Sequence, residues 1–170
     1  MKKIWRLFVS LCLVVLSFSI AGCFFTEENS NKSNNSNTVY YLGETATNSK
    51  NVDFTVTSIK DTTKIGYNET ENNFIILTIR IKNNGNESWE QNPNNCVLLC
   101  NGAKYEYNSA TYSLADSMSS FTEINPGISK TMSIAFETPN KSTESDYSVK
   151  LEGYSFWKDD SVTIKLQERK

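Results

Sequence analysis

The sequence predicts an all-β fold, an antiparallel sandwich of about eight or nine short strands, and two observations lead to this prediction. First, apolar and polar residues alternate with a period of two in successive segments after residue 39, and no stripe with the 3.6-residue helical period stands out. Second, turns rich in Asn, Gly and Pro separate these segments. Strands that are apolar on one face must bury those faces against each other, which gives two packed sheets.

The first 22 residues have the features of an export signal. A basic start over residues 1–6 precedes an apolar run of 14 residues, which is too short for a membrane-spanning helix because such a helix needs about 20. The run closes with Ile20-Ala21-Gly22-Cys23, which resembles the lipobox of bacterial lipoproteins. The resemblance implies cleavage between Gly22 and Cys23 and transfer of a diacylglyceryl group to the Cys23 thiol.

A diacylglyceryl group on Cys23 would hold the protein stably on a membrane without spanning it, because each buried CH2 contributes about 0.8 kcal/mol. Residues 26–38 are rich in Asn and Ser and contain no apolar residue, which predicts a flexible tether. We therefore divide the chain into a signal peptide (1–22), a lipidated cysteine with its tether (23–38) and one sandwich domain (39–168). This places the domain on the extracytoplasmic side of the cell membrane.

The alternation and the turns locate the individual strands. Asn101-Gly102 separates two of them and is typical of a tight type I′ hairpin. Residues 112–120 are the one stretch with a weak helical pattern. The strands are expected near residues 40–42, 52–57, 75–82, 96–100, 104–107, 121–124, 132–137, 147–152 and 162–166.

Several short motifs follow one another in a recognisable order along residues 39–166. They are Leu42-Gly43-Glu44, a strand ending near Ile59, residues 74–84 with Asn83-Asn84-Gly85, Asn101-Gly102-x-x-Tyr105, and Asn125-Pro126-Gly127 followed by Phe136-Glu137-Thr138-Pro139. Together they resemble an immunoglobulin-like domain of unknown function found in many bacterial lipoproteins, kin to a small secreted mycobacterial immunogen. The resemblance implies an immunoglobulin-like sandwich and supplies no activity and no catalytic residues.

The composition argues against several classes of function. The chain has no His, which excludes Ser-His-Asp and Cys-His catalysis and imidazole metal ligands. Three of the 17 Lys and Arg residues lie in the signal, whereas all 19 Asp and Glu residues follow Cys23, so the mature chain is acidic and ill suited to nucleic acid. No spacing of carboxylates singles out a glycosidase pair or a calcium loop. We therefore expect that the protein is not an enzyme and binds no cofactor.

Cys96 and Cys100 are the sharpest chemical feature of the domain. The Cys-x-x-x-Cys spacing occurs in some copper-handling and thiol-redox proteins, but no third ligand lies nearby in sequence. A strand places residues four apart at about 13 Å, too far for a disulfide, and on one face. Buried core thiols are the first interpretation, and a disulfide on an irregular backbone or a metal or redox site are the alternatives.

Aromatic residues close to carboxylates in sequence form a candidate binding surface. These residues are Trp89, Tyr154, Phe156 and Trp157. If exposed, they could bind a sugar ring or a partner protein. If buried, they would instead cover the rim of the sandwich core.

The sequence therefore predicts a lipid-anchored bacterial surface protein whose domain is a non-catalytic binding or interaction module, with an envelope or extracellular protein as its partner. The loops at one end of the sandwich, or an exposed sheet edge that accepts an added strand, would capture that partner. The alternative is a thiol- or metal-handling envelope protein that uses Cys96 and Cys100. A two-lobed solute receptor is disfavoured, because about 130 folded residues leave no room for two lobes.

Overall fold

The computed structural model describes residues 38–139, 147–153 and 160–169. The predicted signal peptide, the lipidation site at Cys23 and most of the predicted tether lie outside these residues. The described chain consists of strands and two short 3-10 helices, which confirms the predicted all-β sandwich. It contains no helix that is long and apolar enough to cross a membrane.

The described residues form eleven strands, which is more than the eight or nine expected. The elements are β1 (Tyr40–Tyr41), β2 (Thr45–Thr47), β3 (Val52–Ile65), β4 (Asn68–Asn83), β5 (Trp89–Gln91), η1 (Pro93–Asn95), β6 (Cys96–Cys100), β7 (Ala103–Tyr105), η2 (Ser109–Ser113), β8 (Thr122–Ile124), β9 (Ser129–Thr138), β10 (Tyr147–Leu151) and β11 (Val162–Lys165). The two unexpected strands, β2 and β5, have three residues each, too few for alternation to be recognised. The weakly helical stretch 112–120 contributes only the end of η2.

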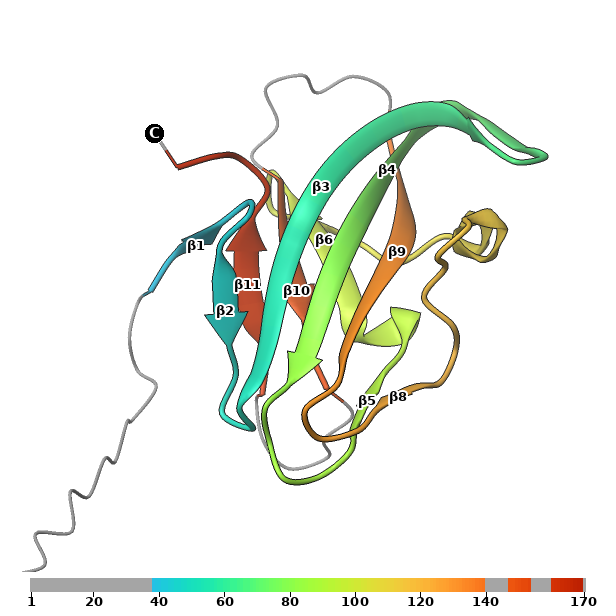
Figure 1. The fold of residues 1–170 in the computed structure, drawn as a ribbon. Coiled ribbons are helices and arrows are strands. Elements are labelled where there is room, and N and C mark those ends of the chain that lie inside the picture. The colour runs from blue at the N-terminus through green and yellow to red at the C-terminus, as the bar shows by residue number, and fades with distance from the viewer. Residues whose placement is uncertain (1–37, 140–146, 154–159, 170) are drawn as a thin grey trace, which may run out of the picture. The chain divides into compact units, whose positions relative to one another are not determined.

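Two sheets face each other, with β3, β4 and β9 in front of β6, β10 and β11 in Figure 1. One sheet has the order β1-β11-β10-β6-β7 and the other β2-β3-β4-β9, while β5 and β8 form a separate two-stranded ribbon. The period-two alternation turns one face of each sheet inward. Phe54 and Ile134 from one sheet and Leu98 and Ile164 from the other are fully buried in one shared core.

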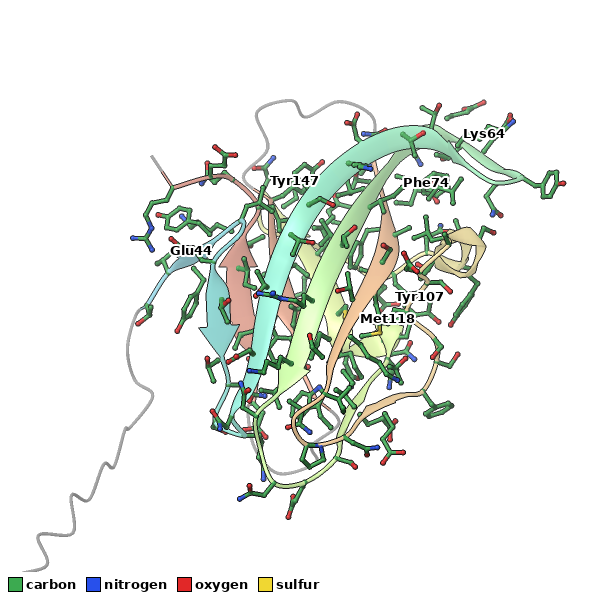
Figure 2. The ribbon with its side chains drawn as sticks, in the orientation of Figure 1. Glu44, Lys64, Phe74, Tyr107, Met118 and Tyr147 are labelled. Carbon is green, nitrogen blue, oxygen red and sulfur yellow. The ribbon has the colours of Figure 1, made fainter. Side chains whose placement is uncertain are left out.

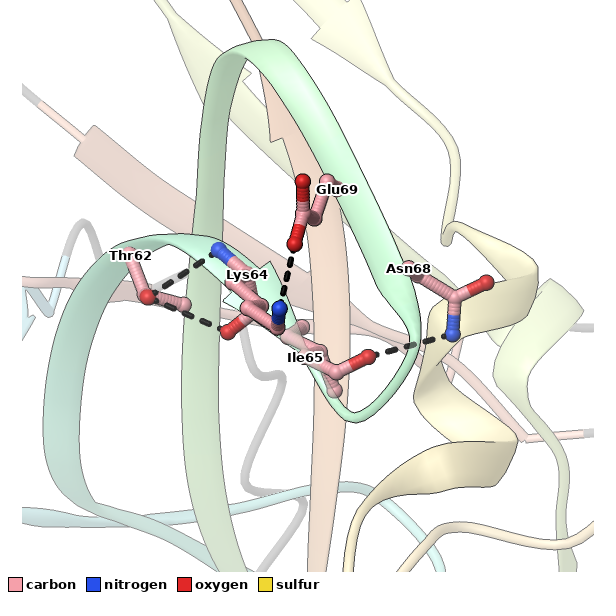
Figure 3. Close-up of polar contacts among 5 residues, drawn as sticks. All are labelled: Thr62, Lys64, Ile65, Asn68 and Glu69. Atoms are coloured by element: carbon pink, nitrogen blue, oxygen red, sulfur yellow. Dashed lines mark hydrogen bonds and ion pairs between the residues drawn. The ribbon is translucent and has the colours of Figure 1, made fainter.

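The β3–β4 hairpin continues beyond the sheet as a two-stranded arm, residues 62–72, seen at the upper right of Figure 1. The arm turns at Gly66, whose φ of 58° lies in the left-handed region that favours glycine. Close to this turn Asn68 donates from Nδ2 to the Ile65 carbonyl oxygen over 3.2 Å (Figure 3). Ile65 also packs with Ala110 of η2 in a small second core, which ties the arm to the domain.

The first and last strands of the domain lie side by side. β1 pairs with β11 in parallel, whereas the other strand pairings of the described chain are antiparallel. Arg169 donates from Nε and Nη2 to the two carboxylate oxygens of Glu44, over 2.6 and 2.9 Å, and its guanidinium lies 4.7 Å from the centre of the Tyr41 ring. Nη2 also donates to the Val39 carbonyl oxygen over 3.3 Å, so the C-terminal segment holds the start of β1 in place.

The β9 edge and the outer part of β3 offer little room for an added strand. The outer edge of β9 is occupied by the segment 107–118, which donates from Asn108 N to Ala135 O over 2.7 Å and from Met118 N to Ser133 O over 2.8 Å. The outer part of β3, which has no neighbour on the β2 side among the described strands, is irregular at two points and rich in charged side chains. Irregular and charged edges resist pairing. The loop ends of the sandwich are therefore the better place to look for a site.

Candidate functional site

A pocket of about 680 Å³ lies at the end of the sandwich where three connections meet. Its walls are residues 49–52 of the β2–β3 connection, residues 83–88 after β4, the first two residues of β5, and Asp160 just before β11. We call it the loop-end pocket. Most of the side chains that line it are polar or charged. Because the three connections form its walls, its shape depends on how they are held together.

Asn83 holds two of the connections in place. Its side chain is buried, and its Nδ2 donates to the carbonyl oxygens of Glu87 over 2.7 Å and of Ile124 over 2.8 Å. Its Oδ1 accepts from Gly85 N over 2.9 Å. One carboxamide therefore fixes both the loop after β4 and the end of β8, because three backbone groups depend on it.

The β2–β3 connection is fixed by Asn48 and by contact with the loop after β4. Asn48 accepts at Oδ1 from the backbone N–H groups of Lys50 and Val52, over 3.0 and 2.9 Å, and donates from Nδ2 to the Asp160 carbonyl oxygen over 3.3 Å. The two connections touch at Gly85, where a Cβ atom would lie 2.7 Å from the Lys50 carbonyl oxygen. A side chain at that position would push the two walls of the pocket apart.

Asp160 brings a buried carboxylate to the pocket. The residue is 4% exposed, and the Ser49 hydroxyl donates to its Oδ1. Its other oxygen, Oδ2, is buried and has no hydrogen-bond partner among the described residues. A buried polar oxygen without a partner is costly. The charged lining residues are Lys50, Glu87, Glu90 and Asp160, which together favour a positively charged group.

Asp160 could not be singled out from the sequence, because its partner Ser49 lies far away in the chain. The Asp160 carboxylate and the Ser49 hydroxyl are separated by 111 residues. The one local signal was the Asp159-Asp160 pair, which follows the candidate aromatic residues in the sequence.

Trp89 does not form the exposed binding surface that we considered for it. It is 8% exposed, its ring meets Phe54 edge to face at 5.8 Å between centroids, and its Nε1 donates to Gln91 Oε1 over 3.1 Å. In β5 the side chains of Trp89 and Gln91 point inward while that of Glu90 is half-exposed, so the acidic neighbours gave a misleading indication of exposure. The other three candidates, Tyr154, Phe156 and Trp157, lie outside the described residues.

Cys96 and Cys100 both face the core from β6, and neither forms a disulfide. Burial raises the pKa of the Cys96 thiol to about 12, against the opposing effect of a hydrogen bond from Gln91. The thiol is therefore protonated at neutral pH, whereas metal binding and redox exchange need the thiolate. The described part of the chain contains no group of three or more Cys, Asp or Glu side chains placed to hold a metal ion. These observations argue against the thiol- or metal-handling alternative.

Several solved structures share this fold. The ycdA protein of Bacillus subtilis, described as a candidate lipoprotein, aligns with a TM-score of 0.59 and 14% identity over 75% of this chain, which spans only 38% of that protein. The yjhA protein of Bacillus subtilis aligns with a TM-score of 0.59 and 15% identity over 76% of this chain and all of the other. MPT63, a secreted protein of Mycobacterium tuberculosis, aligns with a TM-score of 0.56 and 16% identity over 77% of this chain and 97% of the other.

No curated protein matches the sequence. Residues 40–162, which make up well over half of the chain, match the family described as Domain of unknown function, DUF4352. This match and the shared fold of MPT63 confirm the resemblance that the order of motifs indicated. The chain therefore belongs to the DUF4352 family.

Proposed function

We propose that this protein is a non-catalytic binding module, held on the outer side of the cell membrane by a lipid on Cys23, that takes its ligand in the loop-end pocket. The observation that carries the proposal is the acidic lining of this pocket, to which Asp160, Glu87 and Glu90 contribute. The arrangement of the surrounding loops supports a preformed site, because Asn83 and Asn48 hold the walls by hydrogen bonds.

The chemistry of the pocket favours an organic cation as the ligand group. An ammonium or guanidinium group brings both a positive charge and several donors, and a hydrogen bond between ions is about twice as strong as a neutral one. Carboxylates of Glu87 and Glu90 also line the pocket, against the single positive charge of Lys50. The cationic group could belong to a small molecule or to a Lys or Arg side chain of an envelope protein.

The proposed location rests on the predicted signal sequence and lipobox, and two proteins of the same fold support it. One of these is a candidate lipoprotein and the other is a secreted protein. We expect a Cys23→Ser chain to lose its attachment to the membrane, because the hydroxyl of serine cannot take the diacylglyceryl group. Fractionation of cells that produce the two chains would find the parent with the membrane and the variant in soluble form or uncleaved. Equal membrane association of both mature chains would contradict lipid anchoring.

The pocket is tested with the full chain in detergent micelles and with spermidine as the probe. We expect spermidine to raise the midpoint of thermal unfolding of the parent, because a ligand that binds the folded state stabilises it. An Asp160→Asn chain keeps the size of the side chain and loses its charge, so it should bind spermidine about tenfold more weakly or worse.

Asp61→Asn is the matched control, because Asp61 is exposed on β3 and does not line the pocket. This variant should bind spermidine as the parent does, and anionic glutamate should bind to none of the three chains. Equal binding of spermidine by the Asp160 and Asp61 variants would show that the pocket is not the site. Absence of any shift in the parent would overturn the proposal of a cation-binding pocket.

A further inference from the structure

The sequence contains the dipeptide Asn-Gly twice, at Asn84-Gly85 after β4 and at Asn101-Gly102 between β6 and β7. The dipeptide is chemically labile, because glycine has no side chain to keep its backbone nitrogen away from the carboxamide carbon of the preceding asparagine. Both copies contain the same two reacting groups. A difference in their reactivity on the folded protein must therefore come from how the fold holds them.

The copy at Asn84 is held at both reacting groups. Asn84 donates from Nδ2 to Asp53 Oδ2 over 2.7 Å, and the Gly85 N–H donates to Asn83 Oδ1 over 2.9 Å. The backbone of Asn84 is fixed as well, because its N–H donates to the Asn51 carbonyl oxygen over 3.0 Å and its carbonyl oxygen accepts from Asn51 Nδ2 over 2.9 Å. Reaction between the two groups therefore requires several hydrogen bonds to break first.

The copy at Asn101 is held much more weakly. Both of its residues are exposed, and in the part of the chain that the structure describes no hydrogen bond engages the Asn101 carboxamide. A Cβ atom at Gly102 would have nothing within 4 Å. The Asn101 side chain is therefore free to change its rotamer, and nothing packs against the glycine that follows it.

The hairpin that carries Asn101 can also open at little cost. Asn101 and Gly102 have φ angles of 48° and 81°, as in the predicted type I′ turn, and the Asn101 Cα–C bond must rotate before the Gly102 nitrogen reaches Cγ. β7 stands at the end of its sheet, has three residues and exposes Ala103 and Lys104. Short segments with few buried contacts open locally at a small fraction of the free energy of global unfolding.

We propose that Asn101 deamidates spontaneously on the folded protein, whereas the fold protects Asn84. The Gly102 nitrogen forms a bond to Asn101 Cγ, and the side-chain amide leaves as ammonia with the proton of the Gly102 N–H. A five-membered succinimide ring remains, and water opens it at either carbonyl group to give aspartate or isoaspartate at residue 101. Water is the only co-reactant, so the reaction needs no enzyme.

The modification alters one edge of the domain and leaves the loop-end pocket unchanged. Isoaspartate lengthens the main chain by one methylene group between Cys100 and Ala103, which pair across the hairpin. Cys100 also pairs with Tyr147 of β10, which is labelled in Figure 2, so β6 stays held on its other side. The added backbone atom should therefore release β7 without unfolding the sandwich. Asn84 lines the loop-end pocket and Asn101 does not.

The test incubates the full chain in detergent micelles at mildly alkaline pH, where more of the backbone amide is deprotonated, and measures both sites by mass spectrometry of peptides. On the folded protein we expect about tenfold more product at Asn101 than at Asn84, because only Asn84 needs its hydrogen bonds broken. In urea above the unfolding midpoint, the two sites should react at rates within about threefold of each other, because the fold no longer holds either of them. Equal product at the two sites of the folded protein would overturn the proposal, and so would reaction of Asn101 only in urea.

Gly102→Ala is the matched variant, because a Cβ atom hinders the attacking nitrogen. It should lower the product at residue 101 by about tenfold and leave Asn84 unchanged. Hydrogen exchange over residues 103–105 should be faster in the isoaspartate form than in the parent, and Asn101→Asp, which adds the charge without the methylene group, should exchange like the parent. Unchanged exchange in the isoaspartate form, or equally fast exchange in Asn101→Asp, would overturn the proposed release of β7 by a longer main chain.

Discussion

Replacing Gly153 with alanine is expected to lower the free energy of unfolding by about 3 kcal/mol, because overpacking a filled core forces side chains or backbone to move. A Cβ atom at this position would lie 2.0 Å from Cη2 and 2.4 Å from Cζ2 of Trp89. The indole of Trp89 cannot easily move aside, because it packs on Phe54 and is hydrogen-bonded to Gln91. Urea unfolding followed by circular dichroism measures the change.

The matched control for this substitution is Gly102→Ala, at which a Cβ atom would have nothing within 4 Å. Gly102 has a φ of 81°, so alanine there costs only the strain of the left-handed conformation, about 1 kcal/mol. A Trp89→Leu, Gly153→Ala double variant removes the clash, so its loss should be smaller than the sum of the two single losses. If the decreases in the free energy of unfolding were additive, the indole of Trp89 would not be the group for which Gly153 leaves space.

Asn83→Ala is expected to cost about 3 kcal/mol, because it leaves backbone groups of Gly85, Glu87 and Ile124 without the partner that Asn83 supplies. The Ile124 carbonyl oxygen is buried and cannot recover its bond from water, so the loop after β4 and the end of β8 should loosen together. The same variant should therefore lose binding of spermidine as well as stability. Urea unfolding and the thermal-shift titration report the two effects.

Asn86→Ala is the control for this second prediction, because Asn86 belongs to the same loop and is exposed. Substitution of an exposed residue away from special features changes stability by about 0.5 kcal/mol or less. If the two alanine variants were equally stable, the side chain of Asn83 would not be the element that holds the loop. Hydrogen exchange at Gly85 N–H would then be unchanged also.

The regular strands were predictable from the sequence because their side chains alternate. β4 and β9 run for 16 and 10 residues, which gives the period of two enough repeats to be seen. β5 has three residues, and its brevity concealed both the strand and the burial of Trp89. The equally short β7 was still expected, because the Asn101-Gly102 turn marks where it begins.

The candidate sites depend on contacts between distant segments, so local pattern could not reveal them. Asn83 appeared in the sequence only as part of an Asn-Gly turn, and its amide contacts with Ile124 exist only in the folded chain. The contact of Asp160 with Ser49 depends on where the β2–β3 connection lies. The arm reaches η2 through the hydrogen bond from Asn68 to Ser113, which no spacing along the chain indicates.

The parallel pairing of β1 with β11 has a mechanical consequence. A pull on residue 38 along β1 loads the hydrogen bonds between these two strands in shear, so that they resist together instead of opening one after another. The grip of Arg169 on Glu44 and on the Val39 carbonyl oxygen adds to this resistance at the same point. Tension applied at the start of the domain is therefore resisted by its C-terminal residues, which pair with and hold β1.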